Sequence, residues 1–248
     1  MVEGWIKDTA HAFWKRAGHP DCFPRDLESA VAWATPLAIL RIPNLWVTDV
    51  ELYLRRRQLP IAVQMEDRPL HGCICAYADR GVIIVNGTDT SNQLRFTIAH
   101  EVAHFLRDYV EPRRRAVEKL GVSVMPVLDG IRMATIAERV DSILTGAPIG
   151  IFAHYMHRDD LGETHSETIY SETEADRLAL ELIAAEDEVH RTLPRRLYSL
   201  AFDNRISTVQ RLLVRRFGLP RSIASQYAQR LCRLWFGGPS IREWLAIT

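Results

Sequence analysis

The spacing of apolar residues predicts helices at the start of the chain. The apolar side chains of MVEGWIKDTAHAFWKRAG fall on one helical face. PRDLESAVAWATPLAILRIP also predicts a helix, with a proline in its first turn and a kink at Pro36. TDVELYLRRRQ opens with Thr48 and Glu51 in a capping-box pattern, so we expect a third, short helix there.

The period then changes to that of β-strands. IAVQME, HGCICAYA and RGVIIVN are short β-prone runs separated by polar turns. We expect the turn at residues 79–81 to join the last two runs as a hairpin. These runs predict a small β-sheet ahead of a long helical part of the chain.

The segment RFTIAHEVAHFLRDY, residues 95–109, predicts an amphipathic helix. An apolar stripe spaced by three and four residues is expected to be its buried face, and consists of Leu94, Ile98, Val102 and Phe105. Polar residues cluster on another side of this helix: Thr97, His100, Glu101, His104 and Asp108. The two histidines therefore lie off the apolar stripe, beside a carboxylate.

Helices are predicted over most of the remaining chain. EPRRRAVEKLG stops at Gly121, VSVMPV is expected to be extended, and IRMATIAERVDSIL is helical again. A polar, histidine-rich stretch then precedes a strong helix from Ser171, SETEADRLALELIAAEDEV. The last part predicts two helices around a turn at Gly218 and Pro220. The expected fold class is α+β, mostly helical, with a small β-sheet and a C-terminal helical region.

Composition fits a globular protein of one large domain or two small ones. The chain has 248 residues, of which 47% are hydrophobic and 25% charged. No run reaches the roughly 18 apolar residues of a membrane span, and the N-terminal residues lack the apolar block of a secretory signal. We therefore expect a cytoplasmic protein without a membrane partner.

The four cysteines do not form a C-x-x-C pair. They are Cys22, Cys73, Cys75 and Cys232. Cys73 and Cys75 lie two apart in a predicted strand and are expected to point to the same face. Reduced, buried thiols are the favoured interpretation for a chain of this length.

Charge is unevenly distributed along the chain. Residues 190–248 hold eleven arginines against two acidic residues, a net charge of +9, which the rest of the neutral chain balances. We therefore divide the chain into residues 1–189 and a basic, arginine-rich helical region, 190–248. Such asymmetry predicts a nucleic-acid contact, or a basic helical segment docked on or solvated beside an acidic domain.

His100, Glu101 and His104 form the pattern H-E-x-x-H. On a helix, residues four apart lie on one face, so both imidazoles can reach one metal ion. Glu101 is too close to be an ideal third ligand, but it is well placed to hold a water molecule beside the metal and take its proton. The pattern predicts a zinc site, with Glu101 as the catalytic residue; two surface histidines are the alternative.

A catalytic zinc site needs a third protein ligand. Glu172 is the favoured candidate, since Glu172 and Asp176 share a helical face and Asp176 can hold a ligand histidine by its other ring N–H. Glu174 competes with Glu172, although Ser171 and Glu174 also fit a capping box. The remaining candidates, each also plausible as a solvated residue, are Asp108, His154, His157 and His165.

Three segments in this order, FTIAHEVAH after a hairpin, ETEADRLALELI and LVRRFGLPRSIASQYAQRL, resemble the ImmA/IrrE family of zinc metallopeptidases. The resemblance spans roughly residues 40–108 and 172–234. It implies a zincin-like core, with His100, His104 and Glu172 as zinc ligands, Glu101 as general base and Asp176 behind a ligand. Family members typically cut a helix-turn-helix repressor and so release mobile-element or stress-response genes.

The sequence departs from the family in two places. The 67 residues between His104 and Glu172 resemble an insertion, at about 110–170, which we expect to form a mostly helical flap over the cleft. AAEDEV replaces the apolar, proline-containing ending that often follows the second metal-binding helix.

The implied reaction is zinc-assisted hydrolysis of a peptide bond in a protein substrate, such as a helix-turn-helix repressor. Four residues are candidates for the oxyanion donor: Tyr109, His157, His165 and Tyr170. Two other interpretations stay open. One is a regulatory DNA- or protein-binding module with a structural or vestigial zinc, which the helix-turn-helix rhythm of VRRFGLPRSIASQYAQRL favours. The other is a component of a toxin–antitoxin pair.

Overall fold

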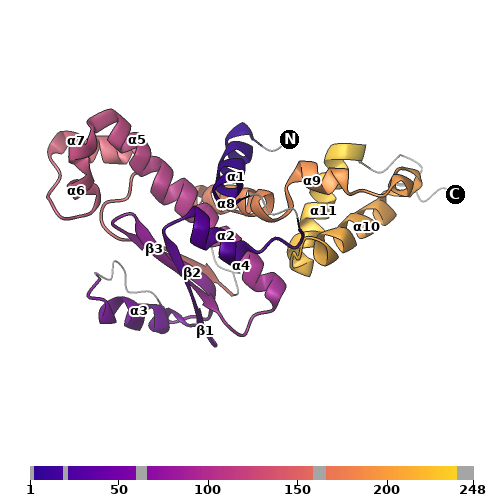
Figure 1. The fold of residues 1–248 in the computed structure, drawn as a ribbon, viewed down its shortest axis with the longest axis horizontal. Coiled ribbons are helices and arrows are strands. Elements are labelled where there is room, and N and C mark those ends of the chain that lie inside the picture. The colour runs from indigo at the N-terminus through magenta and orange to yellow at the C-terminus, as the bar shows by residue number, and fades with distance from the viewer. Residues whose placement is uncertain (1–2, 19–21, 60–65, 159–165, 239–248) are drawn as a thin grey trace.

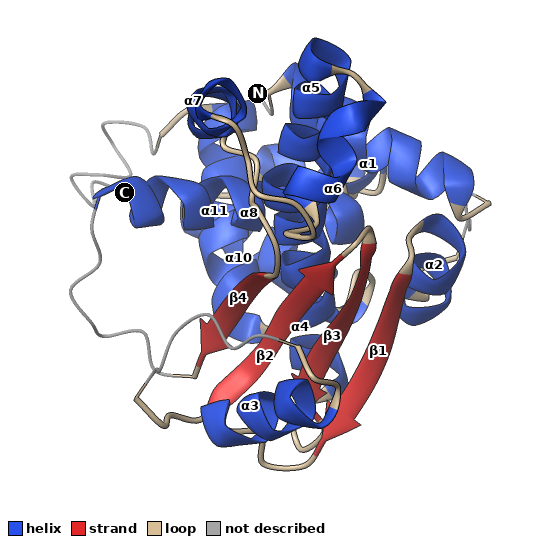
Figure 2. Ribbon diagram, turned by 90° about the vertical axis from the view of Figure 1, so that its left-hand side faces the viewer, coloured by secondary structure: helices blue, strands red, loops and turns tan. Residues whose placement is uncertain are grey.

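A four-stranded sheet lies among the helices of the chain (Figures 1 and 2). The computed structural model describes residues 3–18, 22–59, 66–158 and 166–238. The order in the sheet is β1-β3-β2-β4; β1 is parallel to β3, and β2 is antiparallel to both β3 and β4. The strands are β1 (Leu37–Ile42), β2 (Leu70–Tyr77), β3 (Arg80–Asn86) and β4 (Phe152–His157).

Helices make up most of the described structure, so the fold is α+β and mostly helical, as expected. None of the described helices is long and apolar enough to cross a membrane. The α-helices are α1 (Gly4–Arg16), α2 (Leu27–Ala34), α3 (Val47–Arg56), α4 (Ser91–His104), α5 (Glu111–Leu120), α6 (Met125–Leu128), α7 (Ile136–Thr145), α8 (Ser166–Ala184), α9 (Glu186–Arg191), α10 (Phe202–Arg215) and α11 (Arg221–Phe236).

The expected hairpin is confirmed as β2 and β3. Tyr77 pairs with Arg80, so the turn consists of Ala78 and Asp79, whose φ angles are +46° and +61°. Two consecutive positive φ angles are typical of the two-residue turns that match the twist of antiparallel strands. Of the first β-prone run, IAVQME, residues 61–65 lie outside the described structure.

The expected helix over residues 24–43 is wrong in its second half. It ends at Ala34, and strand β1 begins at Leu37. Thr35 is extended, with φ −140° and ψ 157°, because the residue before a proline is disfavoured in the helical region. Pro36 therefore ends the helix rather than kinking it, and LAILRI pairs in parallel with β3.

Other predicted boundaries need smaller corrections. The VSVMPV segment is not extended, since it forms a 3-10 turn followed by α6. The helix expected from Ser171 begins at Ser166. The short helix near Thr48 begins at Val47, where Asp49 Oδ2 accepts a hydrogen bond from the backbone N of Trp46 at 2.9 Å.

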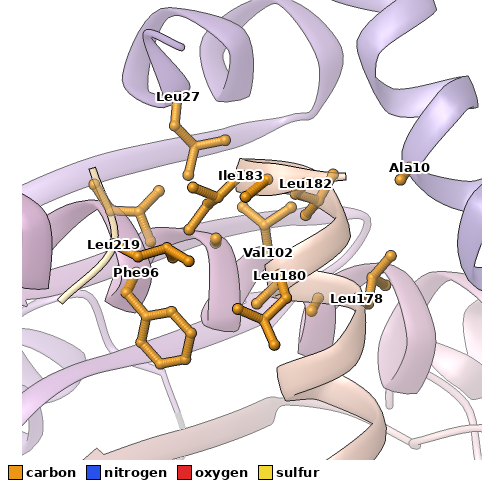
Figure 3. Packing of buried hydrophobic residues seen from close by; sticks show 14 of the residues in the cluster. Ala10, Leu27, Phe96, Val102, Leu178, Leu180, Leu182, Ile183 and Leu219 are labelled. Atoms are coloured by element: carbon orange, nitrogen blue, oxygen red, sulfur yellow. The ribbon is translucent and has the colours of Figure 1, made fainter. Parts of the chain in front are cut away.

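Each face of the sheet has its own apolar core. Helix α3 covers one face, where Cys73 and Cys75 are buried as free thiols, as expected. Cys232 is buried too, but Cys22 is exposed, so the expectation of a buried thiol is wrong for Cys22. On the other face α4 packs along α8, and α1 and α2 lie against them. Figure 3 shows leucines of α8 meeting Phe96 and Val102 of α4.

Helix α4 is buried on more than its apolar stripe. The stripe from Leu94 to Phe105 is buried as expected, but His100 is only 3% exposed, His104 1% and Glu101 0%. Helix α8 and the sheet enclose the side of α4 that carries His100, Glu101 and His104. The histidines and the glutamate are therefore held in the interior, where polar groups need partners.

The insertion between α4 and α8 is not helical throughout. Helices α5 and α6 contribute to a small core of their own, and α7 packs against α5. These three helices lie at the opposite end of the molecule from α10 and α11 (Figure 1). The same insertion then adds β4 to the edge of the sheet, beside β2. It reaches the histidines of α4 through this strand.

Candidate metal centre

His100 and His104 bring two ring nitrogens together on α4. The helix begins after Thr90, whose hydroxyl accepts a hydrogen bond from the backbone N of Gln93. Ten residues later the two histidines lie one turn apart, and their Nε2 atoms are 3.1 Å from each other. The two Nε2 atoms are thus close enough to bind a single metal ion in the interior.

Helix α8 adds a carboxylate oxygen to this pair. Glu172 Oε2 lies 3.2 Å from Nε2 of His100 and 3.6 Å from Nε2 of His104. Tetrahedral ligands with metal bonds of about 2.0–2.1 Å are separated by roughly 3.3 Å. The three atoms therefore fit one face of a zinc coordination tetrahedron.

Each histidine ring is held from behind by an aspartate. His100 Nδ1 lies 3.0 Å from Asp176 Oδ1, and His104 Nδ1 lies 2.7 Å from Asp108 Oδ2. A carboxylate can only accept, so Nδ1 is the donor and Nε2 can be left free for a metal. Arg107 in turn donates to both oxygens of Asp108, at 2.7 and 2.9 Å.

The carboxylates dominate the electrostatics of the cluster. Burial lowers the pKa of His100, but hydrogen bonds to Asp176 and Glu172 outweigh burial and raise this pKa to about 9. Burial raises the pKa of Glu172, but hydrogen bonds from the histidines hold this pKa well below its usual range. Glu172 is thus ionised, as a cation ligand has to be.

Glu101 lies beside the ligand atoms, with its side chain fully buried. Its Oε2 accepts a hydrogen bond from His154, whereas its Oε1 is buried and has no hydrogen-bond partner among the described residues. Buried carboxylate oxygens are normally paired, so the free Oε1 suits a bound water molecule or substrate group. The donor set and this unpaired oxygen both fit a catalytic metal.

His154 is the least expected member of the cluster. From the sequence, His154 was only one of several possible ligands, yet β4 places its ring against His104, with ring centroids 3.6 Å apart. Its Nδ1 is 3.0 Å from Glu101 Oε2 and its Nε2 is 3.0 Å from Glu172 Oε1. Burial lowers the pKa of His154, but Glu101 and Glu172 outweigh burial and raise this pKa to about 10.

A single ion is within reach of four side chains in the described structure: His100, His104, His154 and Glu172. The competing glutamate faces elsewhere, since Glu174 Oε2 lies 3.6 Å from a guanidinium nitrogen of Arg107. Asp108 is occupied by His104 and Arg107, so it supports a histidine rather than joining the ligand triangle.

Of the four oxyanion candidates, the two whose side chains are described, Tyr109 and His157, lie away from the cluster. The hydroxyl of Tyr109 accepts a hydrogen bond from the backbone N of Asp79, in the hairpin turn. His157 pairs with Leu70 and lies on the α3 face of the sheet. His165 lies outside the described residues, and so does the side chain of Tyr170.

A buried H-E-x-x-H helix opposed by a glutamate from a second helix is the arrangement of a metallopeptidase centre. Residues 57–121 match the family model of peptidase M78, described as the IrrE N-terminal-like domain. This match agrees with the resemblance to the ImmA/IrrE family that the sequence indicated. No curated protein and no solved structure matches the chain. The matched residues contain His100, Glu101 and His104 and end before Glu172.

Proposed function

We propose that the protein is a zinc-dependent endopeptidase with a zincin-like core, in which His100, His104 and Glu172 hold the zinc and Glu101 is the general base. One observation carries the proposal: the triangle of two Nε2 atoms and Glu172 Oε2, with sides of 3.1, 3.2 and 3.6 Å. Three protein ligands leave the fourth position of a zinc ion open to water or substrate, as catalysis requires.

The side chains divide the work around this triangle. A zinc ion there would polarise the scissile carbonyl and make a water molecule more acidic. Glu101 accepts the proton of that water on its free Oε1 and passes it to the leaving amine. Asp176 and Asp108 keep the two rings oriented by accepting from their Nδ1 atoms.

Loss of the base tests this function directly. The wild type and Glu101→Gln are loaded with zinc and incubated with purified helix-turn-helix repressors and a peptide library, and new amino termini are counted. Glu101→Gln should bind zinc normally and cleave about 10²–10⁴-fold more slowly, since an amide cannot take the proton. Equal cleavage by both proteins, or cleavage that survives a chelator, would contradict the proposal.

The substrate class is a further part of the proposal. We infer a regulatory protein of the helix-turn-helix repressor kind, recruited by the basic region directly or through the DNA that it occupies. Support comes from the way α10 and α11 are fixed to the catalytic helix: Asn92 Nδ2 donates to Leu219 O at 3.1 Å, and Arg95 to Gly218 O at 3.2 Å. Several arginines of this region are exposed: Arg211, Arg215, Arg216, Arg221 and Arg233.

A further inference from the structure

One histidine from the insertion lies between the two carboxylates that the proposed reaction uses. His154 is the third residue of β4, and its strand neighbours Phe152 and Met156 point to the α4 side of the sheet with it. His154 Nδ1 lies 3.0 Å from Glu101 Oε2, and His154 Nε2 lies 3.0 Å from Glu172 Oε1. His154 thus bridges the general base and the third ligand.

Each of these carboxylates gives one oxygen to His154 and keeps the other for a different task. Glu172 gives Oε1 to the ring and turns Oε2 toward the two Nε2 atoms of α4. Glu101 gives Oε2 to the ring and keeps the buried, unpaired Oε1. The last torsion of a glutamate is broad and two-fold, so holding one oxygen determines where the other points.

The bridging ring is itself held firmly. It stacks on His104 at an interplanar angle of 19°, and only 17% of its side chain is exposed. Its backbone belongs to the sheet, where His154 pairs with Ile74 of β2. A side chain on a strand is better placed to fix its neighbours than one on a free loop.

We propose that His154 is a positioning residue, which orients the carboxylates of Glu101 and Glu172 so that each presents one oxygen to the metal centre. This inference rests on the proposed peptidase function. It gives the insertion a role in the active site, because β4 carries the bridge into the cluster. We assign His154 to positioning rather than to a fourth ligand, because its Nε2 lies against Glu172 Oε1, whereas the two Nε2 atoms of α4 face Glu172 Oε2.

The test compares His154→Ala, His154→Gln and His157→Gln as full-length proteins. His157 is the matched control, because it lies on the same strand and faces the other side of the sheet. Cobalt(II) is titrated into each metal-free protein, with the visible spectrum recorded and affinity measured against a competing chelator. The kcat and KM values of the zinc-loaded proteins are then measured on a cleaved peptide.

A positioning role predicts a specific pattern. His154→Ala should lose about 10–100-fold in metal affinity and should keep the shape of the cobalt spectrum, because the ligands are unchanged. Its kcat should fall by a similar factor while KM stays near the wild-type value. His154→Gln should recover part of both losses, since one amide group can donate to two carboxylates. His157→Gln should resemble the wild type.

Two results would overturn the inference. A changed cobalt spectrum in both His154 variants would make the histidine a ligand, and wild-type affinity in His154→Ala would leave it without a role at the centre. The glutamine variant keeps the test decisive if the alanine variant fails to fold. A wild type that binds cobalt but cleaves nothing would remove the peptidase function and leave the affinity comparison intact.

Discussion

Asp176 Oδ1 accepts a hydrogen bond from Nδ1 of His100 at 3.0 Å, which joins the two helices that form the metal centre. The aspartate lies one turn beyond Glu172 on α8, so one helix supplies both a ligand candidate and the support for another. Half of the Asp176 side chain is exposed, at 48%, whereas the ring of His100 is buried.

Replacement of Asp176 should weaken metal binding without removing it. Asp176→Ala leaves the ring of His100 free to turn and its Nδ1 proton without an acceptor, so zinc affinity should fall by about 10–100-fold. The measurement is the zinc dissociation constant by chelator competition. Asp203→Ala, an exposed aspartate on α10, is the control. Equal affinities in the two variants would show that Asp176 does not support the ligand.

A buried carboxyl under α9 should lower the stability of the protein at neutral pH. Glu181 is 5% exposed, accepts a hydrogen bond from Glu186 N at 3.3 Å, and burial raises its pKa above the usual 4.5. The carboxyl of Glu181 then binds a proton more tightly in the folded state than in the unfolded state. Its contribution to the free energy of unfolding therefore falls as the pH rises above about 4.5.

Glu181→Gln replaces this carboxyl with an amide that does not titrate. The melting temperature of the variant should exceed that of the wild type at pH 7, and the difference should shrink as the pH falls toward 4.5. Glu118→Gln controls for the loss of a negative charge, because the Glu118 side chain is 60% exposed. A Glu181→Gln melting temperature below that of the wild type at pH 7 would contradict the account.

Close packing of α4 on the sheet depends on Gly72. A Cβ atom added there would lie 2.5 Å from Thr97 Cγ2 and 3.0 Å from the carbonyl oxygen of Ile84. Gly72→Ala should therefore destabilise the fold by about 1–3 kcal/mol, and each 1 kcal/mol lowers the melting temperature by roughly 2–4 °C in a chain of this size. Gly4→Ala is the control, since its added Cβ meets nothing within 4 Å.

Charge reversal of α10 tests the proposed recruitment. Arg211, Arg215 and Arg216 are exposed. The Glu101→Gln variant should capture a protein substrate without cleaving it, and changing all three arginines to glutamate in this variant should weaken the capture. The salt dependence of capture should also become smaller, while zinc content stays the same. Capture that is unchanged at both low and high salt would leave the basic region with a structural role only.

The centre could be predicted from the sequence where it depends on helix periodicity. His100 and His104, or Glu172 and Asp176, are four residues apart, and this spacing alone places each pair on one face of a helix. The sequence also indicated that these two faces meet, because Asp176 can hold a ligand histidine while Glu172 binds the same metal ion. The structure then adds distances, such as the 3.2 Å between Glu172 and His100.

His154 could not be found in the same way. Its position depends on the pairing of β4 with β2, about 80 residues earlier in the chain, and no local pattern encodes such a pairing. The alternation of Phe152, His154 and Met156 was the available signal, with a histidine on the apolar face of a short strand. Strand β1 was missed for a related reason, because only its pairing with β3 distinguishes it from a helix after Pro36.

Zinc stoichiometry tests the central claim most directly. The wild type, Glu172→Ala and Glu174→Ala are purified alike, dialysed, and analysed for bound metal per chain. The account predicts one zinc per chain in the wild type and in Glu174→Ala, because Glu174 faces Arg107. It predicts that zinc is lost or severely reduced in Glu172→Ala, because Glu172 is a ligand. Full zinc in Glu172→Ala, or no zinc in the wild type, would contradict the account.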